Sequence, residues 1–263
     1  MAVSEQLLLS LRPRAEIRFD SFFVSPDNSE LIHALRQWLL SPHPGIFFMA
    51  GPPGSGRSHL LQAASAEIEN ALYLPLKELK DLDPTALLEN LESTALLCCD
   101  DIDAVSADRS WCEALFYLFN RHVGLSLTTP LDAPLNAEVN LAGAANNAED
   151  LIRSGGKWLV SALAPAAQIN CALPDLASRL SWGGSFRLAP LDDKGRQQML
   201  QLQAKQRGMG ISDEVAAYIL RHHARDTPAL LNLLERIDRE SLREKQRVNV
   251  NFVRKLLGNS GVN

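Results

Sequence analysis

The 263-residue chain lacks several features that mark special classes of protein. Its four cysteines, Cys98, Cys99, Cys112 and Cys171, show no C-x-x-C spacing, which argues against a disulfide framework or a zinc site and favours reduced thiols. An excess of positive charge is also missing, because 26 basic residues face 31 acidic ones. The resulting formal charge of −5 argues against a strongly basic nucleic-acid binder, although it leaves room for a local basic patch.

Long hydrophobic runs are absent from the N-terminus. The first residues, MAVSEQLLLSLRPR, contain an acid and an apolar run too short for a signal-peptide core or a membrane span. We therefore expect a cytoplasmic protein without membrane contact. The hydrophobic share of 46% is ordinary for a globular protein, and the length allows one large domain or two smaller ones.

Apolar runs alternate with helical patterns through the first two thirds of the chain. Strands are predicted at residues 45–50, 71–76, 95–99 and 158–163. Helices are predicted from Ser58, from Pro84 with Asp83 as its cap, and over residues 110–122. This alternation predicts an α/β domain with a mostly parallel sheet, over residues 15–190. Residues 125–156, rich in Ala, Asn, Thr and Pro, predict a solvated insertion within it.

The pattern becomes entirely helical after Pro190. Four helical segments are predicted at residues 192–208, 212–224, 227–245 and 251–258. The expected terminal residues are Ser212, either Asp226 or Thr227, Gly208 and Gly258. We therefore expect a small all-helical domain over residues 191–263, with a boundary near residues 188–191.

The stretch GPPGSGRSHLL (Gly51–Leu61) fits the phosphate-loop pattern G-x-x-x-x-G-K-[ST] except that Arg57 replaces the lysine. A strand precedes it and a helix follows, as a loop of converging backbone N–H groups requires. The Ser58 hydroxyl is expected to hold Mg²⁺. The candidate nucleotide-binding residues are Pro53, Gly54, Ser55, Gly56, Arg57, Ser58 and His59.

Arg57 makes the state of this loop an open question between a working site, a degraded site and a chance match. Lysine places a compact point charge between phosphates, whereas arginine presents a longer planar fork that can still pair with phosphate oxygens. We expect nucleotide binding, ADP or ATP, to be retained. Turnover is expected to be slowed or shifted toward holding a diphosphate.

Two acids, Asp100 and Asp101, close the apolar run ALLCC. In such sites the first carboxylate orients the magnesium shell, so Asp100 is the candidate metal residue, and the second polarises the attacking water, so Asp101 is a candidate catalytic residue. The alternative is that these acids only cap a strand or the next helix. Asp103 is expected to be a helix cap rather than a ligand.

Together these motifs resemble the AAA+ ATPases, and specifically the DnaA family of bacterial replication initiators and their shorter homologues. FDSFFVSPDNSELIHAL (residues 19–35) looks like the segment that lies against the adenine, which implies a contact from Phe22. LPDLASRLSWG (residues 173–183) looks like the arginine-finger box and makes Arg179 the catalytic finger. HARDTPALLNLLERID (residues 223–238) is similar to the sensor-2 helix, with Arg225 over the phosphates. The resemblance implies a P-loop NTPase domain followed by a helical lid.

The N-terminal peptide QLLLSL is similar to the Q-L-x-L-x-L peptide by which shorter members of the family dock on the DNA polymerase III β sliding clamp. It implies that a tail, residues 1–14, contacts the clamp through Gln6, Leu7, Leu9 and Leu11, and reaches DNA only through it. Because the sequence stops at Asn263, soon after the helical segments, we expect no DNA-binding domain like that of the initiator.

Some positions depart from the family pattern. Leu8 and Ser10 replace the usual small residue and proline of the clamp peptide. Pro228 stands where the lid often has another basic residue. Ser161 could contact phosphate, but the polar residue expected near Leu163 is missing. These departures weaken the case for self-catalysed hydrolysis more than the case for nucleotide binding.

The resemblance implies a regulator that holds ADP, docks on the clamp and stimulates hydrolysis of the ATP bound to DnaA. A homo-oligomer is possible. An alternative is an autonomous AAA+ ATPase, such as an initiator-like protein or a helicase loader, for which Asp101 would be the working base. A small-molecule phosphotransferase is a third class, but the helical segment offers no cluster of basic residues to cover the loop.

Overall fold

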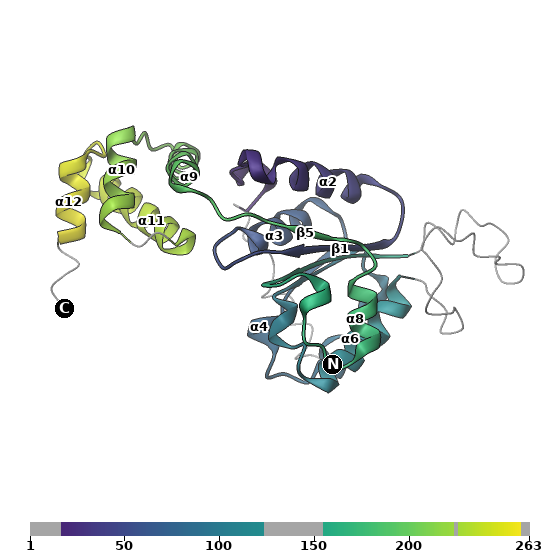
Figure 1. Ribbon diagram of the computed structural model, residues 1–263. Helices are drawn as coiled ribbons and strands as arrows, with labels where there is room; N and C mark the ends of the chain where they lie inside the picture. Colours follow the sequence, from purple (N-terminus) through teal and green to yellow (C-terminus); the bar gives the residue numbers. More distant parts are fainter. Residues whose placement is uncertain (1–16, 124–154, 224–225, 259–263) are drawn as a thin grey trace, which may run out of the picture.

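The computed structural model describes residues 17–123, 155–223 and 226–258 (Figure 1). The predicted clamp peptide, almost all of the predicted insertion and Arg225 lie outside the described residues. The strands are β1 (Gly45–Ala50), β2 (Ala71–Pro75), β3 (Leu96–Asp100), β4 (Lys157–Ala162) and β5 (Ser185–Arg187). The α-helices are α2 (Ser29–Leu40), α3 (Arg57–Glu67), α4 (Leu76–Leu79), α5 (Pro84–Leu87), α6 (Arg109–His122), α8 (Pro174–Leu180), α9 (Asp193–Gln206), α10 (Asp213–His222), α11 (Thr227–Glu244) and α12 (Val250–Gly258).

The five strands form one parallel sheet in the order β2-β3-β4-β1-β5. All residues of β3 are buried, as expected for a parallel strand covered on both faces. Because β1, β3 and β4 lie side by side, the phosphate loop after β1 and the two acids at the end of β3 meet at the same edge. This order confirms the predicted α/β class with a parallel sheet.

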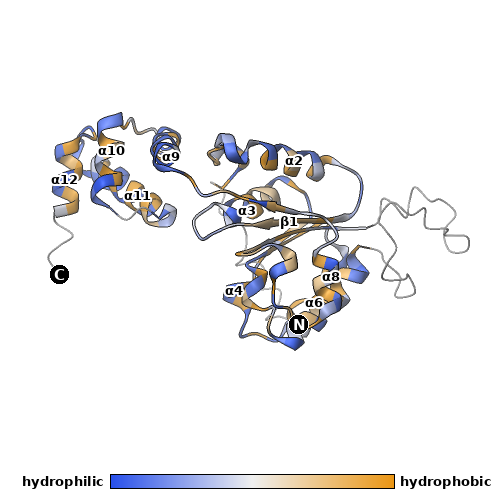
Figure 2. Cartoon of the chain, viewed as in Figure 1, coloured by the Kyte–Doolittle hydropathy of each residue, from blue (hydrophilic) through white to orange (hydrophobic). Residues whose placement is uncertain are grey.

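Side chains of successive strand residues separate into two cores. In β1, Ile46 and Phe48 pack with α6 and α8, whereas Phe47 and Met49 pack with α2 and α3. Figure 1 shows α2 and α3 on one face of the sheet and α4, α6 and α8 on the other. The apolar sides of these helices face the sheet (Figure 2).

Helix α2 and strand β5 are elements that the sequence analysis did not predict. Helix α2 buries Leu31, Ile32, Leu35 and Leu39 at helical spacing, so its signal was present in the sequence. Strand β5 has only three residues, and it joins the sheet because the chain passes β1 very closely at Gly183. A Cβ atom there would lie 1.8 Å from the carbonyl oxygen of Ile46, which only glycine avoids.

The four C-terminal helices, α9 to α12, pack around their own apolar core beside the sheet (Figure 1). Ser212 caps α10, and the Asp226 side chain accepts a hydrogen bond from Ala229 N, which decides between the two expected caps of α11. Gly208 follows α9 with a positive φ of 75°, as predicted for a C-terminal glycine. Gly258 is the last described residue of α12, so its predicted role as a C-terminal glycine stays a prediction.

Other boundaries differ from those expected. The helix predicted from Pro84 is a single turn, although Asp83 caps it as predicted through Thr85 N. Strand β2 ends at Pro75 because α4 begins at Leu76. Among the described helices, none has both the length and the apolar character that a bilayer span requires.

Candidate nucleotide-binding site

The phosphate loop leads from β1 into α3, as its sequence predicts. Gly54 and Gly56 have positive φ values of 76° and 102°, and α3 begins at Arg57 without a side-chain cap from its N-cap residue, Gly56. The Ser55 hydroxyl is buried and has no hydrogen-bond partner among the described residues. A turn of this kind at the positive end of a helix suits a phosphate group.

Phe22 lies directly on this loop. A Cβ atom at Gly56 would stand 2.5 Å from Phe22 Cε2, so this position must be glycine for the ring to approach. The ring centroid of Phe22 also lies 5.5 Å from that of His59 on α3. The structure therefore brings the segment before α2 against the loop, while the contact of Phe22 with adenine, which the family resemblance implies, stays a prediction.

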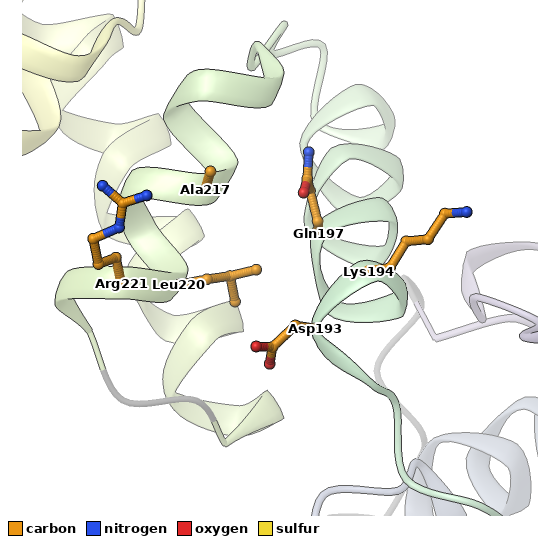
Figure 3. Close-up of a pocket in the computed structure, with 6 residues that line it drawn as sticks. All are labelled: Asp193, Lys194, Gln197, Ala217, Leu220 and Arg221. Carbon is orange, nitrogen blue, oxygen red and sulfur yellow. The ribbon is translucent and has the colours of Figure 1, made fainter.

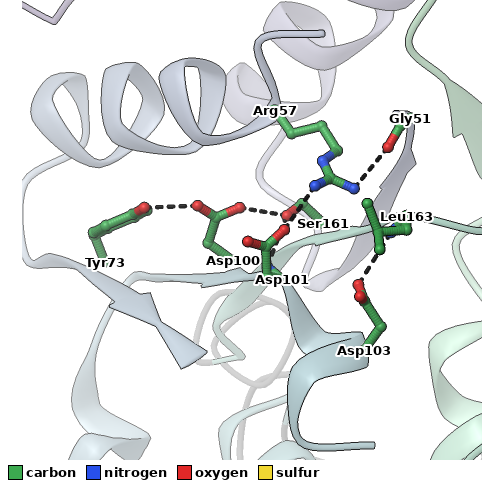
Figure 4. A network of polar contacts seen from close by, with 8 residues as sticks. All are labelled: Gly51, Arg57, Tyr73, Asp100, Asp101, Asp103, Ser161 and Leu163. Atoms are coloured by element: carbon green, nitrogen blue, oxygen red, sulfur yellow. Dashed lines mark hydrogen bonds and ion pairs between the residues drawn. The ribbon is translucent and has the colours of Figure 1, made fainter. Parts of the chain in front are cut away.

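Arg57 points along the sheet edge toward β3 (Figure 4). The residue is 7% exposed, and its side chain donates one hydrogen bond to the carbonyl oxygen of Gly51 and one to Asp101 Oδ1, each at 2.7 Å. Both ends of its fork are therefore used within the protein. Burial raises the pKa of Asp101 above its usual value, the neighbouring Asp100 adds to this, and Arg57 opposes it.

Asp100 is held by two hydroxyl groups from neighbouring strands (Figure 4). Tyr73 on β2 donates to Asp100 Oδ2 at 2.7 Å, and Ser161 on β4 donates to Oδ1. Burial and the Asp100 charge raise the pKa of Tyr73 further above its usual value, so this hydroxyl stays protonated and donates the hydrogen bond. Ser161 thus contacts Asp100, and it also accepts a hydrogen bond from Asp101 N at 3.0 Å.

Asp103 is not the helix cap that the sequence analysis expected. Its Oδ1 accepts a hydrogen bond from Leu163 N at 3.0 Å, which ties the loop after β3 to the loop after β4. The cap of α6 is Asp108, whose side chain accepts from Ser110 N and Trp111 N. The side chain at position 163 is an apolar leucine, as noted from the sequence, and the residue is 51% exposed at this edge.

The donor set does not fit a magnesium ion in this arrangement. Asp100 is 4% exposed with both oxygens bonded to hydroxyl groups, and Asp101 is paired with Arg57. Within the described residues, no three side chains of the His, Cys, Asp and Glu types form a group that could hold a metal. The predicted pairing of Ser58 with Asp100 around Mg²⁺ therefore finds no support in these contacts.

The first turn of α11 touches the phosphate loop. Thr227 Oγ1 donates to the carbonyl oxygen of Gly54 at 2.8 Å, and Pro228 Cδ lies 3.8 Å from the place of a Cβ at Gly54. Gln203 on α9 also donates to the carbonyl oxygen of Ser21 at 2.6 Å. The helical segment is therefore seated over the loop, next to the position where the sequence analysis expected Arg225.

Arg179 lies on the other side of the sheet, in α8. Its side chain is only 5% exposed, with its guanidinium carbon 3.9 Å from the Trp182 ring centroid and 6.0 Å from that of Phe116. Its Nε finds no hydrogen-bond partner in the described part of the chain. Burial lowers the pKa of Arg179, and Asp175 opposes this. A finger that serves a neighbouring site must leave this aromatic pocket first.

A shallow hollow in the helical segment is separate from these residues. It has a volume of about 330 Å³ and lies between α9 and α10 (Figure 3). Its lining consists of Asp193, Lys194, Gln197, Ala217, Leu220 and Arg221. This set contains none of the predicted site residues that the structure describes.

Comparison with known proteins identifies the helical segment and the fold. Residues 193–257 match the family model described as "Hda, lid domain". The helical segment is therefore similar to the lid domain of Hda. Domain III of the replication initiation protein DnaA from Thermotoga maritima aligns with a TM-score of 0.68 and 17% identity, over 94% of this chain and 97% of that one. The resemblance to Hda, a DnaA-like AAA+ protein, is thereby confirmed through the lid and the fold.

Two further solved structures share the AAA+ fold. AMPPCP-bound DnaA from Aquifex aeolicus aligns with a TM-score of 0.62 and 18% identity, over 86% of this chain and 65% of that one. The RuvB Holliday junction branch migration motor of Thermotoga maritima aligns with a TM-score of 0.56 and 19% identity, over 93% and 71%. At these identities the likeness concerns the fold.

Several residues at the site were missed by sequence reasoning. Tyr73 and Trp182 were not singled out, and Thr227 was considered only as a cap. Tyr73 meets Asp100 only because β2 lies next to β3, which the chain order does not specify. Trp182 lay within the quoted finger box, three residues after Arg179, so its spacing was the available signal.

Proposed function

We propose that this chain is an Hda-type regulator of DNA replication initiation, which holds ADP and promotes hydrolysis of the ATP bound to DnaA. The observation that carries the proposal is the Hda lid domain seated on a phosphate loop through Thr227 and Gly54. The AMPPCP bound to DnaA from Aquifex aeolicus supports adenine nucleotide as the ligand class.

The contacts of Arg57 favour holding a nucleotide over hydrolysing one. A base that activates water needs an available carboxylate, but Asp101 is paired with a buried guanidinium. The same pair weighs against the autonomous ATPase. Residues 51–58 would hold the diphosphate, with Phe22 and His59 beside the loop and Arg225 above it.

Catalysis in this proposal acts on the partner. Arg179 would leave the Trp182 pocket, reach the nucleotide of a neighbouring DnaA and stabilise the charge that develops on the transferred phosphoryl group. Gln6, Leu7, Leu9 and Leu11 would dock the chain on the DNA polymerase III β clamp, so contact with DNA is indirect. The proposed location is the cytoplasm, and a homo-oligomer would be compatible with an AAA+ body.

Reconstitution of DnaA·ATP with DNA-loaded clamp tests this proposal. Conversion of bound ATP to ADP is followed with and without the chain, and we expect it to accelerate only when chain and clamp are both present. Equal conversion without the chain would refute the regulatory role.

A second experiment tests the clamp peptide on its own. Gln6→Ala combined with Leu9→Ala should abolish recovery of the chain on immobilised clamp, since the peptide needs its glutamine and its leucines. Leu8→Ala is the matched control and should bind like the parent, because the motif leaves this position open. Equal recovery of both variants would remove the docking role.

A further inference from the structure

Both acids at the carboxyl edge of the sheet already contact protein groups. Asp100 accepts from Tyr73 and Ser161, and Asp101 Oδ1 accepts from Arg57 at 2.7 Å. These contacts come from four different elements, β2, β3, β4 and α3, so they belong to the packed edge of the sheet rather than to a mobile side chain. A hydrated cation at this edge would have to displace one of them.

Magnesium makes strict demands that this edge does not meet. The ion needs near-octahedral oxygen ligands at about 2.0–2.1 Å and keeps several of its waters. Asp100 is 4% exposed, which leaves no room for such waters on its carboxylate. Asp101 already has a positive partner, whose charge would repel a divalent cation.

Arg57 supplies at this place what a cation would supply. Its guanidinium carries a permanent positive charge and spans from the carbonyl oxygen of Gly51 at the start of the loop to Asp101 at the end of β3. The charge therefore sits between the loop that would receive the phosphates and the acids that would repel them. Lysine, with one point charge and no fork, would not hold both contacts in the same planar geometry.

We propose that the loop binds a nucleoside diphosphate without a divalent cation, the Arg57 guanidinium occupying the place at Asp101 that a metal would need. This inference rests on the proposed function, because it concerns the same nucleotide site. The phosphates are held by the backbone N–H groups of the loop and the start of α3. Arg57 neutralises the charge of Asp101, which lies behind the phosphates.

Calorimetric titration of the full chain with ADP gives the first test. One buffer contains excess Mg²⁺ and the other contains EDTA. Because Mg²⁺ complexes ADP in solution, we expect the apparent Kd in Mg²⁺ to be equal to that in EDTA or larger. Affinity that falls tenfold or more in EDTA, about 1.4 kcal/mol, would overturn the inference and leave the proposed nucleotide site standing. No ADP binding in either buffer would overturn both.

Two variants with the same chemical change give the second test. Arg57→Lys removes the fork at the site, and Arg109→Lys makes the same change in an exposed pair with Glu113. We expect Arg57→Lys to bind ADP more tightly in Mg²⁺ than in EDTA, since Asp101 becomes available to a hydrated ion. Arg109→Lys should behave like the parent. An identical response of both variants to Mg²⁺ would contradict a special role for the Arg57 fork.

Electron paramagnetic resonance with Mn²⁺ reports the metal directly. In the presence of ADP and the parent chain, free Mn²⁺ should fall no further than ADP alone accounts for. A ternary complex of chain, ADP and Mn²⁺ would refute a metal-free site, whatever the affinities.

Discussion

Arg57 and Arg179 are both buried, with exposed fractions of 7% and 5%, but their surroundings are opposite. Arg57 donates to a carboxylate and a carbonyl oxygen at the edge of the sheet. Arg179 lies on the Trp182 ring, and its Nε is unpaired as far as the described residues reach. Moving an arginine away from a buried carboxylate is costly, because the carboxylate loses its partner. Moving an arginine off an aromatic ring costs only about 1 kcal/mol, and the guanidinium is hydrated again once it is exposed. Burial alone therefore does not tell a structural arginine from one that can act elsewhere.

The largest effect is expected at Arg179. Arg179→Ala should lower stimulation of DnaA's ATP hydrolysis by about a thousandfold, because a finger stabilises the transferred phosphoryl group. Phosphate release from DnaA·ATP, followed in the reconstituted system, measures it. ADP binding by the variant serves as the control and should equal that of the parent. Undiminished stimulation would make Arg179 a structural residue like Arg57.

The next effect concerns stability. Arg57→Ala should lower the free energy of unfolding by about 3 kcal/mol, because it leaves Asp101 and the Gly51 carbonyl oxygen without their partner. Chemical denaturation of this variant beside Arg179→Ala provides the measurement. We expect a clearly smaller loss for Arg179→Ala, and equal losses would erase the distinction between the two pockets.

A smaller effect concerns the contact between Arg179 and the Trp182 ring, whose interaction energy is about 1 kcal/mol. If DnaA·ATP draws the arginine out, the Trp182 resonance of a chain labelled with 5-fluorotryptophan should move in its ¹⁹F spectrum. Trp182→Phe identifies this resonance among the four tryptophans. Arg179→Ala should shift it without DnaA. A resonance that stays in place upon DnaA·ATP binding would show that the finger remains in its pocket.

The smallest effect concerns pH. Burial lowers the pKa of His59 below its usual 6.5, although a hydrogen bond with the carbonyl oxygen of Arg18 opposes the shift. Protonation of His59 then favours the unfolded chain. The contribution of His59 to the free energy of unfolding should therefore be complete above pH 6.5 and decrease as the pH falls below that value. Burial lowers the pKa of His122 as well, which adds to the same trend.

A matched pair of variants separates these contributions. Denaturation between about pH 7.5 and pH 5.5 should show a weaker pH dependence for His59→Gln and an unchanged one for Arg179→Ala. An unchanged slope in His59→Gln would mean that His59 titrates as in the unfolded chain.

Local signals predicted much of the fold. The apolar runs of β1, β3 and β4 and the glycine loop before α3 were found from pattern alone, because each is encoded in consecutive residues. The short strand β5 was missed, since it depends on a close approach of Gly183 to Ile46 rather than on its own pattern. Asp103 was misassigned for a similar reason: its partner, Leu163 N, is 60 residues away.

By itself, the sequence determined that a strand, a glycine-rich turn and a helix follow one another, that two acids end a buried strand, and that a helical segment comes last. These properties depend on periodicity and backbone preference over a few residues. Tertiary structure decided which groups those acids contact. The order β2-β3-β4-β1-β5 places Tyr73, Ser161 and Arg57 around Asp100 and Asp101, and hydrogen bonds between strands distant in sequence follow only from that order.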